Sequence, residues 1–497
     1  MADLPANNTG VGGFTESYDD MIHSRFDWFR EKKLQNLVKG RRRIKIYPIT
    51  ANEPYAFIIP ANPKKWTDMQ TLRFHARYRV WNVTRDSAPA DTENFSLVNN
   101  IHHSMWAQIS IRVNGDEFED ATTTTYPFKA YIQTLLNTDN YYKEIVLGPT
   151  SAWAYDTGTS GTGTSLNPYK TTTGLDPNDF DDSTTEDVMM SEGPDYATWS
   201  LHKIKKRLRD KDEDYNEGYV KRRKGISTGS WVDFQMVPQH DLITTKEIFE
   251  PNTRYDIVMT RMKDDFCFIQ PASNTDQYRI DLENICFTVE QVEVTAATNN
   301  YHQSKKRSGK TPTAQIRRNM IKYYPVEHGK MDLGQSNIFF TAPLPEQVYI
   351  FFVDQAAFHG TKHTNPFHFE NLKIAEASLQ VNGVNEPPDC YSTSKTGGEL
   401  DVYHQFLFAT GSRPNEPEAV PITFDMYKKG YFILAWDRTP NKDNGYFNNE
   451  VDTGYIDLNI RLTEALTNNN RMVVVYSSYK QDIEMNGDRL EMKKICI

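Results

Sequence analysis

The second half of the chain repeats three short segments of the first half in the same order. The pairs are residues 44–49 (IKIYPI) with 321–326 (IKYYPV), 110–115 (SIRVNG) with 378–383 (SLQVNG), and 257–260 (IVMT) with 460–463 (IRLT). Self-similarity at a long period is the signature of a duplicated architecture. The repeat therefore predicts two similar domains, each with the same order of elements.

The spacing of the repeats locates an insertion in the first half. The offset between partners is 277 residues at Ile44, 268 at Ser110 and 203 at Ile257, so about 65 extra residues lie between Gly115 and Ile257. Within that interval, residues 149–230 are rich in Thr, Ser, Gly and Asp and then in mixed charges, a composition typical of solvated surface. We predict a long surface insertion there, without a packed core of its own.

Most of the remaining chain has the two-residue periodicity of strands. Ile109, Ile111 and Val113 alternate with polar residues and end at Asn114-Gly115, a pair that favours a tight hairpin turn. One exception is residues 127–136, where a proline precedes apolar residues at helical spacing, which predicts a short helix. The fold class we predict is all-β: two tandem jelly-roll β-sandwiches, a double jelly roll, with a short helix and a long surface insertion.

The predicted domain limits follow from these patterns. Residues 1–39 form an N-terminal arm with an amphipathic helix, 40–296 the first jelly roll with its insertion at about 149–230, 297–318 a basic linker, and 319–497 the second jelly roll. The first residues predict no secretory signal, and no apolar run is long enough for a transmembrane segment. The four cysteines have no metal-ligand or disulfide spacing, which indicates reduced thiols.

Motifs that would carry catalysis or metal binding are incomplete. Residues 304–311 (SKKRSGKT) end like a phosphate-binding loop, but Ser304 stands where its first glycine is required. His359, His363 and His368 lie close together in the sequence without a framework of cysteines or carboxylates that would complete a metal site. We therefore predict no catalytic residues, no metal site and no cofactor, and a protein that is not an enzyme.

Charge is the one binding signal in the sequence. The 497 residues carry a formal net charge of −10, which excludes a protein whose whole surface coats nucleic acid. The predicted linker is the exception, because it holds six cations with no acid between them, namely Lys305, Lys306, Arg307, Lys310, Arg317 and Arg318. Such a segment can neutralise phosphates without reading base sequence, although a merely solvated linker explains it equally well.

Four segments carry a resemblance to a known family. They are residues 126–136 (YPFKAYIQTLL), 352–360 (FVDQAAFHG), 365–369 (NPFHF) and 378–383 (SLQVNG). With them the chain resembles the double jelly-roll major capsid proteins of Polinton/Maverick-type elements, adintoviruses and related DNA viruses. The likeness runs from about residue 42 to about 482 and fades through the insertion.

The resemblance implies a structural role and a set of partners. In that family two jelly rolls per chain stand side by side, and three chains form a pseudo-hexameric capsomer that tiles an icosahedral capsid around double-stranded DNA. The expected partners are then the chain itself, as a homotrimer and a capsid lattice, minor or penton capsid proteins, and packaged DNA in nonspecific contact with the linker. The expected location is the virion, with synthesis and assembly inside the host cell, in the cytoplasm or nucleus. By the same resemblance the insertion would form a tower on the outer surface, while the linker and arm would lie at the base.

Two other functions remain open from the residues alone. A jelly-roll glycan-binding protein, similar to a lectin, would need a compact cleft of aromatic and carboxylate side chains on one domain. A β-sandwich hydrolase would need two convergent carboxylates or a histidine cluster that holds a metal.

Overall fold

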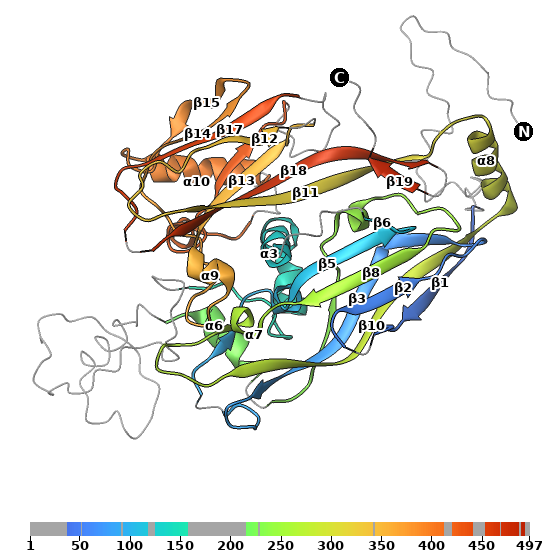
Figure 1. The fold of residues 1–497 in the computed structure, drawn as a ribbon, viewed down its shortest axis with the longest axis horizontal. Coiled ribbons are helices and arrows are strands. Elements are labelled where there is room, and N and C mark those ends of the chain that lie inside the picture. The colour runs from blue at the N-terminus through green and yellow to red at the C-terminus, as the bar shows by residue number, and fades with distance from the viewer. Residues whose placement is uncertain are drawn as a thin grey trace, which may run out of the picture.

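The chain folds into two antiparallel β-sandwiches that lie side by side in the computed structural model (Figure 1). The structure describes residues 37–50, 52–90, 93–117, 125–157, 215–226, 229–340, 343–411, 420–440, 453–467, 469–486 and 489–492. The predicted arm and its amphipathic helix, and the middle of the predicted insertion, therefore lie outside the described residues.

Two four-stranded sheets form the first sandwich. One sheet has the order β1 (Val38–Ile46), β10 (Tyr278–Val294), β3 (Trp66–Asn82), β7 (Val232–Met236), and the other β2 (Tyr55–Ile59), β8 (Tyr255–Arg261), β5 (Trp106–Val113), β6 (Asp116–Glu117). Two short strands, β4 (Ser96–Leu97) and β9 (Phe268–Ile269), pair with each other beside them. Alternate residues of β3, from Leu72 through Phe74 to Val80, point into the core, as expected for a strand with one buried face.

The second sandwich has the same plan. One sheet has the order β11 (Thr313–Val326), β18 (Arg471–Asn486), β13 (Gln347–Asp354), β16 (Leu434–Asp437), with β19 (Arg489–Met492) beside β18. The other has the order β12 (Gln335–Phe340), β17 (Tyr455–Leu462), β14 (Ile374–Val381), β15 (Val384–Tyr391).

Both sandwiches are jelly rolls with the same strand order. We set aside the short strands β4, β9 and β19 and rank the eight main strands of each half along the chain. Both halves then have the order 1-8-3-6 in one sheet and 2-7-4-5 in the other. Eight strands in two sheets with Greek-key connections define a jelly roll. The predicted all-β double jelly roll is thus confirmed, and we call β1–β10 the first roll and β11–β19 the second roll.

Each sequence repeat falls on strands of equal rank. Residues 44–46 belong to β1 and 321–326 to β11, both of rank 1; the other two pairs lie on β5 and β14, of rank 4, and on β8 and β17, of rank 7. Asn114-Gly115 and Asn382-Gly383 both turn the chain with positive φ at each residue, the geometry for which Asn-Gly is favoured. The repeat therefore reflects equivalent positions in the two rolls.

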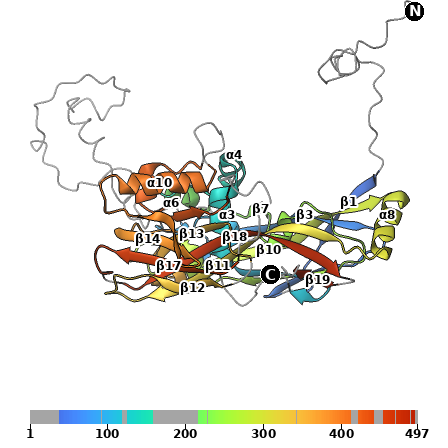
Figure 2. The same cartoon turned by 90° about the horizontal axis from the view of Figure 1, so that it is seen from above.

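Helices occupy the connections between strands. They are α2 (Ile101–Ser104), α3 (Tyr126–Asn137), α4 (Asn140–Tyr142), the π-helix η1 (Lys143–Leu147), α6 (Glu217–Lys224), the 3₁₀ helix η3 (Asp241–Thr244), α7 (Asp264–Cys267), α8 (Ala296–Arg307), α9 (Gln355–His359), α10 (Gly398–Ala409) and α11 (Phe424–Lys428). The predicted helix is α3, with its proline in the first turn. Figure 2 shows α3, α4, α6 and α10 on one side of the long strands.

Two predicted segments have more structure than the sequence indicated. The predicted linker, residues 297–318, contains most of α8 and the beginning of β11, so Arg317 and Arg318 lie in a strand. The described ends of the predicted insertion are packed, since Trp153, Tyr219 and Arg222 are all buried. The sequence did not predict this packing, because an arginine such as Arg222 is expected to be exposed unless a buried partner neutralises its charge.

Candidate functional site: the seam between the two rolls

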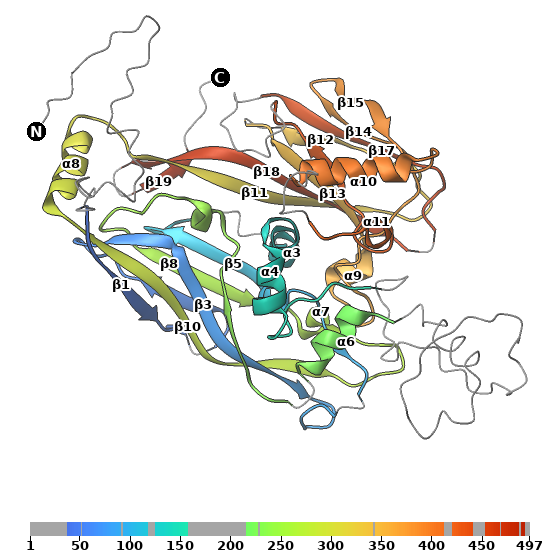
Figure 3. The ribbon, with the colours of Figure 1, turned by 180° about the vertical axis from the view of Figure 1, so that it is seen from behind.

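Helix α3 lies between the two rolls and contacts β5 of the first and β11 of the second (Figures 1 and 3). Ten of its twelve residues are buried. We call this boundary between the two rolls the seam. On the side of the second roll, it is formed by β11 and by residues 355–369, the segment that contains α9. Three of the four segments that carry the family resemblance therefore meet at the seam.

Aromatic rings from both rolls stack across the seam. Phe367 lies parallel to Tyr131 of α3, with ring centroids 4.1 Å apart and planes 4° apart. Phe358 stacks on Phe128 of α3 at 4.8 Å. The edge of Phe266, from α7, meets Phe367 at 6.1 Å. Stacked and edge-on aromatic pairs each contribute about 0.5–1.5 kcal/mol beyond the area that they bury.

A first buried polar cluster joins α3, η3 and β11. Lys129 Nζ lies 2.9 Å from Asp241 Oδ1, and the two side chains are only 9% and 1% exposed. The backbone N–H of Asn319, in β11, donates to Asp241 Oδ2 at 3.1 Å. A single carboxylate of the first roll thus accepts hydrogen bonds from both rolls. Loss of one partner of such a buried pair typically costs 3–5 kcal/mol, because the other charge stays buried without compensation.

A second buried cluster is centred on Asp156, at the described start of the insertion. Arg222 Nη2 of α6 lies 2.7 Å from Asp156 Oδ1, with side chains 0% and 7% exposed. From the second roll, Asn365 Nδ2 donates to Asp156 Oδ2 at 3.2 Å, and the backbone N–H of Asp156 donates to the Tyr431 hydroxyl at 2.8 Å. The two ends of the insertion are thereby attached to each other and to the second roll.

Burial favours the neutral form of the histidines and tyrosines at the seam. It lowers the pKa of His368 to about 4 and that of His240, next to Asp241, to about 3. Burial also raises the pKa of the Tyr131 and Tyr431 hydroxyls well above the usual value. These shifts arise from desolvation of the charged form. Because both ion pairs also bond residues of the second roll, the arrangement fixes one roll against the other.

The six cations predicted as a binding segment divide into two groups. Lys305, Lys306 and Arg307 form the last turn of α8, with Lys310 three residues beyond. Lys306 is paired with Glu250, and the ammonium group of Lys305 lies 5.3 Å from the ring of Tyr301.

Arg317 and Arg318 belong to the second group, in β11. Arg317 donates to Ser478 Oγ at 2.8 Å and also bonds Gln347, while Arg318 lies over Tyr479. Both side chains are partly buried, whereas Lys305, Arg307 and Lys310 are exposed.

Sequence reasoning missed a second run of exposed cations, on β1, in which Lys39, Arg41 and Arg43 pair with carboxylates of the same roll. Residues 39–43 (KGRRR) of this strand are exposed in a continuous run, and Lys45 is exposed as well. The signal was present in the sequence, but the run was interpreted only as a strand.

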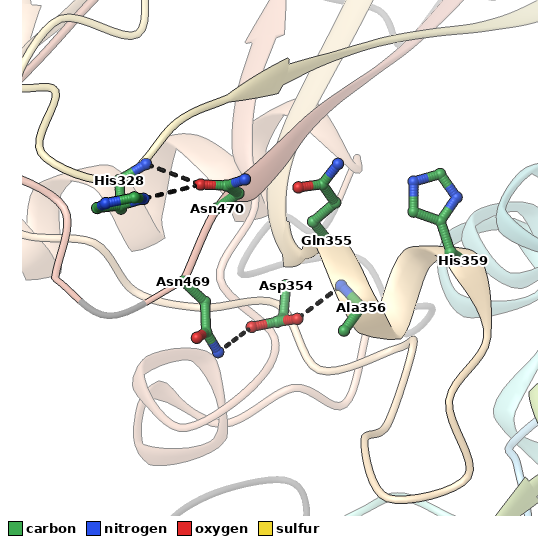
Figure 4. Close-up of a pocket in the computed structure, with 7 residues that line it drawn as sticks. All are labelled: His328, Asp354, Gln355, Ala356, His359, Asn469 and Asn470. Atoms are coloured by element: carbon green, nitrogen blue, oxygen red, sulfur yellow. Dashed lines mark hydrogen bonds between the residues drawn. The ribbon is translucent and has the colours of Figure 1, made fainter.

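A pocket of about 500 Å³ lies at the surface of the second roll (Figure 4). It is lined by His328, Asp354, Gln355, Ala356, His359, Asn469 and Asn470. The carboxylate of Asp354 is already engaged, since it accepts hydrogen bonds from the Ala356 N–H and from Asn469, each at 2.8 Å. The lining contains no Phe, Tyr or Trp ring and a single carboxylate, that of Asp354.

Within the described part of the chain, no group of three or more His, Cys, Asp or Glu side chains is arranged to hold a metal ion. In the same residues, no helix is long and apolar enough to cross a membrane. Cys267, Cys286 and Cys390 are free thiols.

The strand order and the seam define a double jelly-roll protein, and solved structures share this fold. A chain of the Sputnik virophage structure matches 99% of this chain and 94% of its own length with a TM-score of 0.53 at 10% identity. The Faustovirus major capsid protein matches 95% of both chains with a TM-score of 0.50 at 8% identity. At these identities the likeness concerns the fold.

Sequence comparison adds one distant relative. The uncharacterized protein F54H12.2 of Caenorhabditis elegans is 22% identical over 173 residues, which are 32% of this chain and 41% of that protein. The match thus spans less than half the length of the worm protein. No protein-family model matches the chain.

Proposed function

We propose that this chain is a major capsid protein, a structural subunit without catalytic activity. The observation that carries the proposal is the seam, which locks two jelly rolls of identical strand order into one block. A block with two nearly equivalent halves is what a threefold assembly needs to present six similar sides. The fold shared with the Faustovirus major capsid protein supports the same function.

In this proposal three chains form a pseudo-hexameric capsomer, and capsomers tile an icosahedral shell around double-stranded DNA. The protein then resides in the virion after synthesis and assembly in the host cell, and it contacts minor or penton capsid proteins in the lattice. The four segments of the resemblance support an affiliation with Polinton/Maverick-type elements and adintoviruses.

The proposed orientation places α8 at the inner base and the insertion on the outer surface. In support, α8 and α6, which borders the insertion, lie at opposite ends of the long strands (Figure 1). The exposed cations at the end of α8 would then contact packaged DNA through its phosphates.

Neutralising Lys305, Arg307 and Lys310 tests this contact. We expect particles that retain less DNA, and a salt dependence of DNA binding (log K against log salt) that is shallower by about 3, since each phosphate contact contributes roughly 0.9 to the slope. The control is Lys221→Gln with Lys224→Gln on α6. An unchanged slope in the α8 variant would refute the electrostatic role.

The glycan-binding alternative finds less support, because the pocket in Figure 4 lacks the aromatic platform that it requires. The hydrolase alternative needs paired carboxylates or a metal-holding histidine cluster. The pocket holds one carboxylate, and the described residues contain no group of three or more His, Cys, Asp or Glu side chains arranged for a metal. Glycan-array binding or a hydrolytic activity of the purified protein would favour one of these functions instead.

Sedimentation of the purified protein tests the proposed function. A chain of 57.4 kDa should form a trimer of about 172 kDa at micromolar concentration. A folded protein that remains monomeric at high concentration would contradict it.

A further inference from the structure

Two helices hold equivalent places in the two rolls but differ in burial. Helices α3 and α10 both follow the fifth-ranked strand of their roll, and each has twelve residues. Ten residues of α3 are buried, against three of α10. Leu400 and Phe408 of α10 are 45% and 50% exposed, and the exposed His404 lies between them on the same helical face.

The difference has a physical cause within the chain. Strand β11 is the edge of its sheet, because in the sheet order it pairs only with β18. This edge packs against α3 and η3 of the first roll. Helix α10 instead packs on β16, the opposite edge of the second roll. Figure 3 shows α10 on the second roll and apart from the first. Among the described residues, no strand of the first roll covers α10 as β11 covers α3.

Within the described part of the chain, the first roll carries a matching edge strand. Strand β1 has the same rank as β11 and pairs only with β10 in the sheet order. The 277-residue offset aligns Arg42 with Asn319, the residue whose N–H reaches across the seam to Asp241. Just beyond β1, Tyr47 and Ile49 are 65% and 62% exposed.

The two surfaces have complementary chemistry. The α10 surface presents Glu399 and Asp401 in the first turn of the helix, followed by the apolar stripe of Leu400 and Phe408. The β1 surface presents exposed Arg42 and Lys45 and the apolar pair Tyr47 and Ile49. The neighbouring cations Lys39, Arg41 and Arg43 pair with carboxylates of β3 and β10 in the same roll. Opposite charges beside apolar contacts are the usual composition of a specific interface.

We propose that α10 of one copy binds the β1 edge of a second copy and thereby repeats, between chains, the packing of the two rolls within a chain. This inference rests on the proposed capsid function and names the surfaces through which the trimer forms. The contact is heterologous, because two different patches meet, and heterologous contacts can close into rings.

Two variants and their mixture test the interface. The α10 variant is Leu400→Glu with Phe408→Glu, and the β1 variant is Arg42→Glu with Tyr47→Glu. The four side chains are exposed, so we expect the circular dichroism spectrum and thermal unfolding of the wild type. Val384→Glu on β15, at a residue 67% exposed, is the matched control.

We expect each variant alone to sediment as a 57.4 kDa monomer at concentrations where the wild type and the control are trimers. The midpoint of assembly should rise roughly tenfold or more, as for loss of a hot-spot residue. An equimolar mixture should form a dimer of about 115 kDa and nothing larger, because it contains one intact α10 surface and one intact β1 surface per pair of chains.

The outcomes separate this inference from the proposed function. A monomeric wild type would overturn both. Trimers of either variant, or a mixture without the dimer, would overturn the interface and leave the capsid function standing.

Discussion

Replacing Phe367 with alanine should uncouple the two rolls. The side chain is 2% exposed, and its ring partners Tyr131, Phe128 and Phe266 all belong to the first roll. A buried Phe→Ala substitution typically costs 3–5 kcal/mol, from lost transfer free energy and from the cavity left behind. Because Phe367 itself belongs to the second roll, most of this loss falls on the coupling between rolls.

The assay is calorimetric unfolding, supported by urea denaturation at two spectroscopic probes. The wild type should unfold in one transition, while Phe367→Ala should show two, with the less stable roll unfolding first. Phe406→Ala is the control, because Phe406 is fully buried within the second roll and its ring packs on Tyr427 of the same roll. We expect a similar loss of stability in the control, but a single transition.

Two results would refute this reasoning. One is a loss below about 1 kcal/mol for Phe367→Ala, which would mean that the stacked rings contribute little. The other is a single transition in both variants, which would mean that the aromatic stack is not what couples the rolls.

Two further predictions concern a seam glycine and the buried histidines. Gly360→Ala should lower the free energy of unfolding more than Gly309→Ala. Both glycines have positive φ (+86° and +80°), which alone costs an alanine about 1–2 kcal/mol, but only at Gly360 would the new Cβ also meet Phe266, at 2.9 Å. Equal losses of stability in urea denaturation would contradict the clash. Burial lowers the pKa of four histidines to about 3 or 4, namely His102, His103, His240 and His368. The pKa of each histidine in the folded state lies below the unfolded value of 6.5, so the unfolded state binds protons first as the pH falls. The free energy of unfolding should therefore fall from pH 6.5 towards pH 4, by about 2 kcal/mol per histidine at pH 5. His102→Phe should lose the share of one histidine in this pH dependence. A free energy of unfolding that stays constant over this pH range would refute the assignment.

The local parts of the fold could be predicted from the sequence. Alternation in residues 109–113, the Asn-Gly turns and the proline at the start of α3 are each set by a few neighbouring residues, and the structure contains them. The repeat predicted the one feature that spans the whole chain, namely two domains with the same order of strands, because a duplicated sequence keeps the order of its elements.

The seam could not be predicted from the sequence, because its partners are far apart in the chain. Lys129 and Asp241 are 112 residues apart, and Asp156 and Asn365 are 209 apart. Pairs this far apart produce no periodic pattern in the sequence. The position of Arg317 and Arg318 in a strand could have been predicted. Extending the 277-residue repeat backwards from Ile321 aligns both residues with β1.

The central claim, that two locked rolls per chain build a six-sided unit from three chains, is tested most directly by electron microscopy of the purified protein. We predict class averages with a hexagonal outline and threefold symmetry, in which each chain contributes two adjacent lobes. Isolated two-lobed particles at every concentration, or rings with a number of lobes other than six, would contradict it.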